Sequence, residues 1–334
     1  MPETSMAETP PPFDAELAAA LDALPFAVPP LTAEMIPVVR SLPPFLPFQD
    51  ILRDAGVRIR DVEIPTRDGA RITVSVLEHE NRTGPSAGLY LIHGGGMVSG
   101  DRWMGTELVI DWIVRLGLVV VTVDYRLAPE HPDPTPVEDC YAGLAWMAAH
   151  ADELGIAPER ILVMGGSAGG GLAAGTTLLA RDRRGPAILG QLLMCPMLDD
   201  RDDTVSTRQF DEVGTWTRVS NTTGWTALLG DRRGTADVSI YAAPARAGDV
   251  SGLPPTYIDC GSADLFRDED VTYASRIWAA GGDAELHIWA GAFHGFDGIA
   301  PAAAVSRAAM AARTSWLERI LQRTAPASPP ATTS

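Results

Sequence analysis

The stretch RILVMGGSAGGGLAAGTTLLA, residues 160–180, decides the fold class. It opens with an apolar run of strand length and closes with a helix-like run, and between them Gly165, Ser167 and Gly169 match the pattern G-x-S-x-G. A strand that reverses into a helix within a few residues needs glycines beside the serine, because larger side chains would be crowded there while the serine Oγ points outward. The motif therefore predicts that Ser167 is a nucleophile at the end of a strand.

Outward from this stretch, strand-like and helix-like runs alternate along the chain. Eight strands are expected, at residues 57–64, 70–78, 88–93, 118–125, 160–165, 189–195, 256–261 and 284–290. Helices are expected at residues 103–116, 136–150, 168–181, 268–280 and 301–322. This alternation predicts an α/β fold with an eight-stranded, mostly parallel sheet that is flanked by helices.

The remaining segments suggest a division into core, cap and tails. The Pro-rich residues 1–12 and the residues 324–334 are expected to be disordered tails, and residues 13–55 to form N-terminal cap helices. Residues 199–250 break the alternation with many charges and no convincing strand, which predicts a cap insertion. The catalytic core is then expected to comprise residues 56–198 and 251–323.

Composition excludes several classes of partner. The chain of 334 residues has a formal net charge of -17, and such a surface repels nucleic acid and anionic lipid. Its three cysteines, Cys140, Cys195 and Cys260, form no CxxC pair and are expected to be reduced, buried thiols. Without a secretory signal or a long apolar run, we expect a cytoplasmic protein with no integral membrane association.

A second glycine motif follows the expected strand at residues 88–92. His93, Gly94, Gly95 and Gly96 leave backbone N–H groups uncovered, which is what the stabilisation of a developing oxyanion requires. Both this loop and the Ser167 turn follow strands, so both should face the crevice at the carboxyl edge of the sheet.

A serine nucleophile needs a base and a carboxylate. Of six histidines, His294 is the one in a loop after the last expected strand. Asp264 is the preferred acid in TYIDCGSADLFRDED (256–270), and Asp268 is the second choice because it opens the next helix. The order serine, carboxylate, histidine is one of those in which catalytic triads occur.

Several segments together resemble the hormone-sensitive-lipase-like family of α/β-hydrolase esterases over roughly residues 57–322. They are HGGGMVSG (93–100), DYRLAPEHPDPTPVED (124–139), GGSAGG (165–170), GLPPTYIDCGSADLFRDE (252–269) and FHGF (293–296). The resemblance implies an α/β-hydrolase fold with a helical cap, a triad formed by Ser167, Asp264 and His294, and a structural brace at residues 124–139. It also implies an oxyanion hole formed by the N–H groups of Gly94, Gly95 and Ala168.

Two positions depart from this family. Gly166 stands where many relatives have Asp or Thr, and Asp133 stands where an aromatic residue is common. The first departure puts local hydrogen bonding at the turn in doubt, and the second has no physical explanation in the sequence.

The expected function is that of a serine carboxylesterase that hydrolyses short to medium acyl esters without a cofactor or a metal. Phe45, Phe48, Trp216 and Trp225 are candidates for substrate binding, and it is equally consistent with the sequence that they pack the cap onto the core. The expected partner is a small-molecule ester, and formation of a homodimer stays open. The Asp-rich LDDRDD (198–203) lacks the spacing of a calcium loop and is expected to be a solvated turn.

Three alternatives remain. The same triad serves amidases, lactonases and acyltransferases, and a protein of this fold can also bind a ligand without catalysis. The pattern G-x-G-x-x-A at residues 169–174 suggests a dinucleotide-binding protein, but it overlaps the serine turn and leaves the other motifs unexplained.

Overall fold

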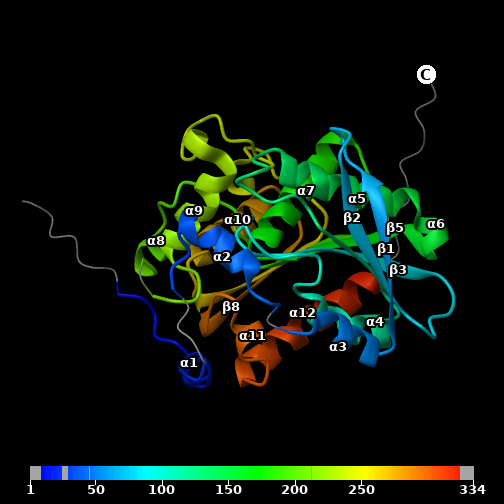
Figure 1. Cartoon of the computed structure of the whole chain (residues 1–334), viewed down its shortest axis with the longest axis horizontal. Coiled ribbons are helices and arrows are strands. Elements are labelled where there is room, and N and C mark those ends of the chain that lie inside the picture. Colours follow the sequence, from blue (N-terminus) through cyan, green and yellow to red (C-terminus); the bar gives the residue numbers. More distant parts are fainter. Residues whose placement is uncertain (1–8, 25–28, 45, 212, 324–334) are drawn as a thin grey trace, which may run out of the picture.

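A single sheet of eight strands runs through the computed structural model, which describes residues 9–24, 29–44, 46–211 and 213–323 (Figure 1). The strand order is β1-β2-β4-β3-β5-β6-β7-β8. The strands are β1 Val57–Pro65, β2 Arg71–His79, β3 Ser86–Ile92, β4 Val119–Val123, β5 Ile156–Gly166, β6 Gly190–Met194, β7 Thr256–Ala263 and β8 Ala284–Phe293. The pairs β1–β2 and β2–β4 are antiparallel and the other neighbours are parallel. The predicted mostly parallel sheet is confirmed.

Helices connect the strands and cover the sheet. The α-helices are α1 Ala15–Asp22, α2 Ile36–Ser41, α3 Phe48–Asp54, α4 Ile110–Leu116, α5 Thr135–Ala149, α6 Ala151–Leu154, α7 Ala168–Arg183, α8 Val205–Gln209, α9 Arg218–Leu229, α10 Arg267–Ala279, α11 Phe296–Ile299 and α12 Ala304–Gln322. The 3-10 helices are η1 Ala33–Met35, η2 Thr106–Val109, η3 Gly230–Arg232 and η4 Pro244–Arg246. Among the described residues, none of these helices has both the length and the apolar character needed to cross a membrane.

The helix expected at residues 103–116 is shorter than predicted. It consists of η2 and α4, and the residue before η2, Gly105, has a φ of 88°. A right-handed helix requires negative φ, so the chain cannot be helical through Gly105. The periodicity of the apolar residues did not reveal this glycine break.

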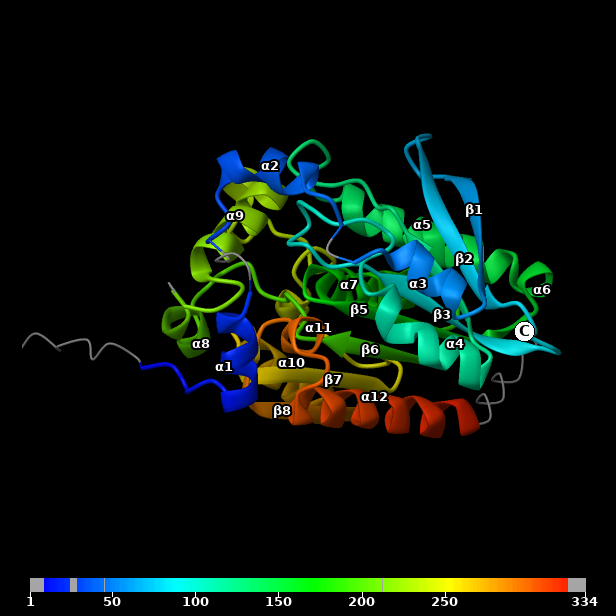
Figure 2. The ribbon, with the colours of Figure 1, turned by 60° about the horizontal axis from the view of Figure 1, so that its bottom comes forward.

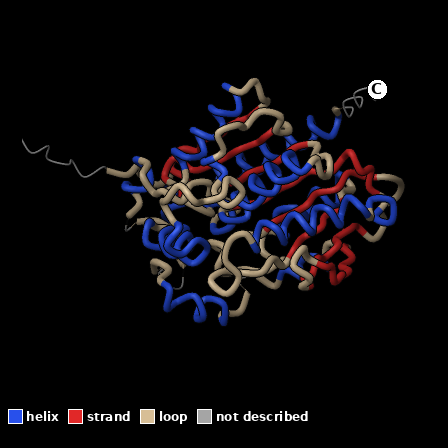
Figure 3. Tube along the Cα trace, turned by 90° about the horizontal axis from the view of Figure 1, so that it is seen from above, coloured by secondary structure: helices blue, strands red, loops and turns tan. Residues whose placement is uncertain are grey.

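Side chains of the central strands alternate between two apolar layers. In β4, Val119, Val121 and Val123 pack into one layer and Val120 packs into the other. Helices α5, α7 and α10 supply residues to the first layer, and α4 and α12 supply residues to the second. Figures 2 and 3 show the helices packed along both sides of the strands. Burial on both faces explains why these strands are continuously apolar in sequence.

The expected cap insertion and part of the expected N-terminal cap lie together at one end of the molecule, whereas α3 packs against β1 and η2. Helices α2 and α9 are side by side in Figures 1 and 2, and Leu31 N–H donates a hydrogen bond of 2.9 Å to Ser220 Oγ. Between residues 199 and 250, the described part of the chain forms α8, α9, η3 and η4 and contains no strand. The domain boundaries themselves stay a prediction, and most of the two predicted tails, residues 1–8 and 324–334, lies outside the described residues.

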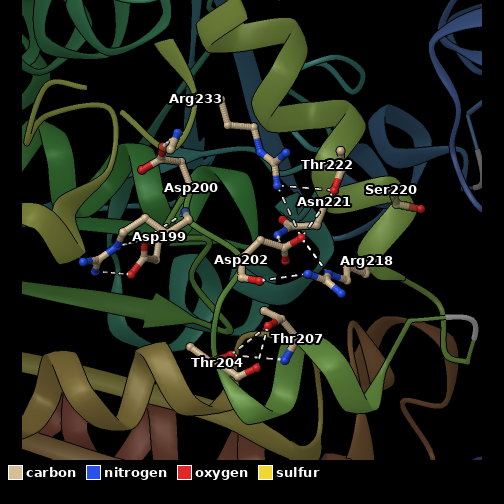
Figure 4. Close-up of polar contacts among 12 residues, drawn as sticks. Asp199, Asp200, Asp202, Thr204, Thr207, Arg218, Ser220, Asn221, Thr222 and Arg233 are labelled. Atoms are coloured by element: carbon tan, nitrogen blue, oxygen red, sulfur yellow. Dashed lines mark hydrogen bonds and ion pairs between the residues drawn. The ribbon is translucent and has the colours of Figure 1, made fainter. Parts of the chain in front are cut away.

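Residues 198–203 contain the expected turn, but the prediction that this turn is solvated is wrong for three of its four aspartates. Asp199, Asp200 and Asp202 are all buried, and arginines distant in sequence neutralise two of them. Asp200 pairs with Arg246 at 2.5 Å and Asp202 pairs with Arg218 at 3.0 Å. Figure 4 shows the Asp202 carboxylate pointing toward side chains of α9 and of the loop that follows it, including Arg218 and Arg233. Buried charges require such partners, and local sequence does not indicate where the partners come from.

Candidate active site

Ser167 occupies a sharp turn between β5 and α7. Its φ of 56° and ψ of −126° form a conformation that residues other than glycine rarely adopt. The turn is held by a hydrogen bond of 2.8 Å from Ser167 N–H to the carbonyl of Met194 at the end of β6. A Cβ atom on Gly165 would lie 2.1 Å from the carbonyl oxygen of Gly169, so the strand end and the helix start are in backbone contact. The predicted strained turn is therefore present in the structure.

The structure brings Ser167, His294 and Asp264 together. His294 Nε2 lies 2.9 Å from Ser167 Oγ, and His294 Nδ1 lies 2.9 Å from Asp264 Oδ2. Each of the three directly follows a parallel strand, which places them at the same edge of the sheet. Asp264 Oδ1 also accepts a hydrogen bond of 3.0 Å from Phe266 N–H, which fixes the carboxylate.

The competing acid and one competing histidine have other roles. Asp268 accepts a hydrogen bond of 2.8 Å from Ser206 N–H and pairs with Arg267, so it contacts the cap segment instead of His294. His93 is buried and stacks on Tyr125 with ring centroids 4.1 Å apart. Burial lowers the pKa of His93, which keeps this imidazole neutral.

The surroundings of His294 favour its protonated form. Burial by itself lowers the pKa of His294, but the adjacent Cys195 and Asp264 outweigh this effect and hold the pKa well above 6.5. Burial also raises the pKa of the Cys195 thiol, so this group is uncharged near neutral pH. We therefore attribute the raised pKa of His294 to the Asp264 carboxylate, which stabilises the imidazolium that forms when a base accepts a proton.

Gly94 and Gly95, two of the residues expected to form the oxyanion hole, line the same cavity as Ser167, and the third, Ala168, follows Ser167 in the chain. A Cβ atom on Gly94 would lie 3.4 Å from Ser167 Cβ, and one on Gly95, which has a φ of 102°, would lie 2.1 Å from the carbonyl oxygen of Ser99. Among the described residues, no hydrogen bond occupies the N–H group of Gly94 or Gly95. Ala168 is the first residue of α7, where an N–H group has no partner within the helix.

The glycine loop is held from two sides. Tyr125 Oη donates to the carbonyl of His93 at 3.0 Å, and Ala128 N–H donates to the carbonyl of Met97 at 3.0 Å. Arg40 of α2 donates from the outside to the carbonyls of Val98 and Ala128, both at 2.6 Å. These contacts agree with the brace that the resemblance implies for residues 124–139.

The structure gives a physical account of both departures from the family pattern. A Cβ atom on Gly166 would have Met194 Cε as its nearest neighbour at 3.2 Å, so this position is not tightly enclosed. Asp133 is 5% exposed in its side chain and pairs with Arg232 of η3 at 3.0 Å. Burial raises the pKa of Asp133 and the arginine opposes this effect. Asp133 therefore ties its turn to the segment expected to form the cap insertion.

A cavity of about 270 Å³ surrounds these residues. Ser167, His294, the glycine loop and Trp216 contribute to its wall. The ring of Trp216 lies 6.3 Å from that of His294, and Thr215 Oγ1 donates a hydrogen bond to the carbonyl of His294. The segment expected to form the cap insertion is thereby attached to the loop that carries His294.

The other substrate-binding candidates lie elsewhere. Trp225 is completely buried in the main core and is not part of the cavity wall. Phe48 is partly buried and packs with the apolar layer on the opposite face of the sheet. Phe45 lies outside the described residues.

Cys195 and Glu107 are among the residues of the cavity wall that the sequence analysis did not identify. Cys195 directly follows β6, so its place at the carboxyl end of a parallel strand could have identified it. Its sulfur, a nitrogen of His294 and an oxygen of Asp264 lie within 4.8 Å of one another, and this is a ligand set that suits Zn²⁺. A cation there would compete with the hydrogen bonds of His294. Glu107 carries no signal in the sequence.

The glycines that suggested dinucleotide binding lie within α7. A Cβ atom on Gly169 would lie 2.2 Å from the carbonyl oxygen of Ile92, and one on Gly171 would lie 2.1 Å from that of Met197. These glycines therefore allow the helix to pack closely on neighbouring backbone.

Comparisons with known proteins agree with this architecture. A family model described as alpha/beta hydrolase fold matches residues 89–298. The esterase LipI of Mycobacterium tuberculosis is 34% identical over 215 residues, which are 62% of this chain and 65% of LipI. The carboxylesterase NlhH of the same organism is 36% identical over 217 residues, which are 64% of this chain and 68% of NlhH. The chain thus spans about two thirds of these relatives.

Solved structures match over a larger share of the chain. A bacterial heroin esterase is 40% identical with a TM-score of 0.84, covering 93% of this chain and 98% of that protein. The esterase LipW from Mycobacterium marinum is 31% identical with a TM-score of 0.81, covering 95% of this chain and all of that protein. The resemblance expected from the motifs is confirmed, and the chain belongs to the hormone-sensitive-lipase-like branch of the alpha/beta hydrolase family.

Proposed function

We propose that this protein is a serine carboxylesterase that acts through Ser167, His294 and Asp264. The observation that carries the proposal is the continuous hydrogen-bonded chain from Ser167 Oγ through both nitrogens of His294 to Asp264, with 2.9 Å at each step. This arrangement suits a nucleophile, a base and an orienting carboxylate. The esterase names of the relatives support the same reaction class.

The reaction has two steps. Ser167 Oγ attacks the ester carbonyl while His294 Nε2 accepts the hydroxyl proton, and His294 then donates this proton to the leaving alcohol. Water afterwards attacks the acyl-serine with His294 again as base, which releases the acid. During both steps the N–H groups of Gly94, Gly95 and Ala168 hold the negative charge on the carbonyl oxygen, a contribution of about 3 kcal/mol per donor.

The cavity at Ser167 favours short to medium acyl groups. Its volume is about 270 Å³, and the indole of Trp216 closes part of it. A long acyl chain would have to displace this ring. The cavity walls are mostly apolar, which suits an acyl chain better than a charged group.

The test is hydrolysis of p-nitrophenyl esters from acetate to palmitate at pH 8 by the wild-type protein and by Ser167→Ala. The proposal expects cleavage of the short esters and background rates for the variant, which should remain folded because the substitution removes a single oxygen. If the folded wild-type protein cleaves an anilide or a lactone but none of these esters, an amidase or lactonase with the same triad replaces the esterase.

A further inference from the structure

A second cavity adjoins the one at Ser167. Its volume is about 680 Å³, and it lies between α4 and α12, which are neighbours in Figure 2. The two cavities share three wall residues, Glu107, Leu108 and Asp297. The two cavities therefore adjoin each other at these residues.

The position of His294 indicates which part of an ester would extend there. His294 donates its proton to the leaving alcohol, so the alcohol oxygen must lie beside its Nε2. The loop after His294 leads directly into α11, and Asp297 of α11 lines both cavities. The alcohol part of the substrate is accordingly the part that faces the second cavity.

Glu107 places an uncompensated carboxylate where the two cavities meet. Its Oε2 atom is shielded from solvent and has no hydrogen-bond partner among the described residues. Burial raises the pKa of Glu107, and the nearby Asp297 carboxylate adds to this effect. Glu107 is half-buried and forms no ion pair among the described residues, so a ligand that brings a positive charge would stabilise its carboxylate.

The other charged residues of the second cavity are more nearly balanced. Asp111 pairs with Arg115 at 2.7 Å, and Asp297 pairs with the buried Arg313. The remaining charged residues on the wall are Arg307 and the exposed Glu318. Glu107 is thus the charged group at the junction that no cation in the described part of the chain neutralises.

We propose that the second cavity binds the alcohol part of esters that carry a protonated amine, with Glu107 as the counter-ion of that amine. The inference rests on the proposed esterase function and adds a substrate class to it. A protonated amine in the second cavity would form an ion pair with the Glu107 carboxylate. A neutral alcohol of the same shape would leave this carboxylate without a cation, and an anionic alcohol would be repelled.

The test compares two acetate esters of nearly equal shape, 3-(dimethylamino)propyl acetate and 4-methylpentyl acetate, at pH 8. We expect the wild-type protein to prefer the cationic ester about tenfold in kcat/KM, and Glu107→Gln to lose most of this preference. Glu107→Asp, which keeps the charge, should retain part of it. The matched control is Glu153→Gln on the exposed surface of α6, which changes net charge equally and should leave the preference unchanged.

The outcome that overturns the inference is an equal preference in the wild-type protein and Glu107→Gln, or an equal loss in Glu153→Gln. Hydrolysis of the neutral ester, and its loss in Ser167→Ala, tests the esterase function separately. If neither ester is cleaved, calorimetric titration of both esters into Ser167→Ala decides the inference. The inference is supported if Ser167→Ala binds the cationic ester more tightly and if this preference disappears in the double variant Ser167→Ala/Glu107→Gln. Equal binding of the two esters by Ser167→Ala refutes the inference.

Discussion

A Cβ atom on Gly165 would lie 2.1 Å from the carbonyl oxygen of Gly169, whereas the nearest neighbour of one on the adjacent Gly166 would be the end of the Met194 side chain at 3.2 Å. The two glycines before Ser167 thus have different roles. Gly165 is required for the contact between the end of β5 and the start of α7. Gly166 faces a flexible side chain that can move.

Alanine substitutions should separate these roles. In Gly165→Ala the added methyl group must push away the backbone of Gly169, which is expected to lower the free energy of unfolding by about 3 kcal/mol. Gly166→Ala should lower it by less than about 1 kcal/mol, because Met194 can change rotamer. Urea denaturation of both variants measures the difference, and similar free energies of unfolding would refute the proposed contact.

The pH dependence of hydrolysis should report on His294. Only neutral His294 can accept the proton of Ser167, and its pKa lies above 6.5, so kcat/KM should rise with pH and reach half its maximum above pH 6.5. A half-maximum below this value would contradict the stabilising effect of Asp264 on the imidazolium.

Replacement of Cys195 distinguishes a neutral thiol from a thiolate. Since burial raises the pKa of Cys195, the thiol carries no charge, and Cys195→Ser should leave the midpoint of this pH profile in place. A downward shift of the midpoint would mean that a thiolate contributes to the raised pKa of His294. The profile of kcat/KM between about pH 5 and 9 measures both cases.

The two tryptophans predicted to bind substrate should respond differently to truncation. Trp216→Ala opens the cavity at Ser167 and is expected to move the best acyl chain of p-nitrophenyl esters to greater length. Trp225→Ala leaves a cavity in the core and should cost about 3–5 kcal/mol of unfolding free energy without changing this preference. If both variants shifted the preferred acyl-chain length equally, the shift could not be attributed to the position of Trp216 in the cavity wall.

Arg313 holds two carboxylates beneath the site. It is 2% exposed and pairs with Asp259, which is 1% exposed, and with Asp297, next to the His294 loop. Arg313→Met leaves both carboxylates without a cation and should lower the free energy of unfolding by about 3–5 kcal/mol. Arg319→Met breaks the exposed ion pair with Glu285 and should cost less than about 1 kcal/mol. If chemical denaturation gave comparable losses of unfolding free energy for the two variants, burial would not determine how much each ion pair contributes to stability.

Local signals in the sequence predicted the features that depend on local geometry. Glycines around Ser167 indicate a strained turn, and the ends of strands place Asp264 and His294 at one edge of the sheet. Features that depend on distant partners were not predictable in this way. The buried Asp200 pairs with Arg246, which lies 46 residues further along the chain. Trp225 is buried in the core and Trp216 is not, and this difference depends on how the segment that carries both residues folds.

The most direct test of the account is covalent labelling with a fluorophosphonate probe followed by peptide mass spectrometry. The account predicts one adduct per chain, located on Ser167, and no adduct in Ser167→Ala. Labelling should weaken strongly in Asp264→Asn, because the imidazole loses the carboxylate that orients it. An unlabelled Ser167 in folded wild-type protein, or an adduct on another residue, would contradict the assignment of Ser167 as the nucleophile.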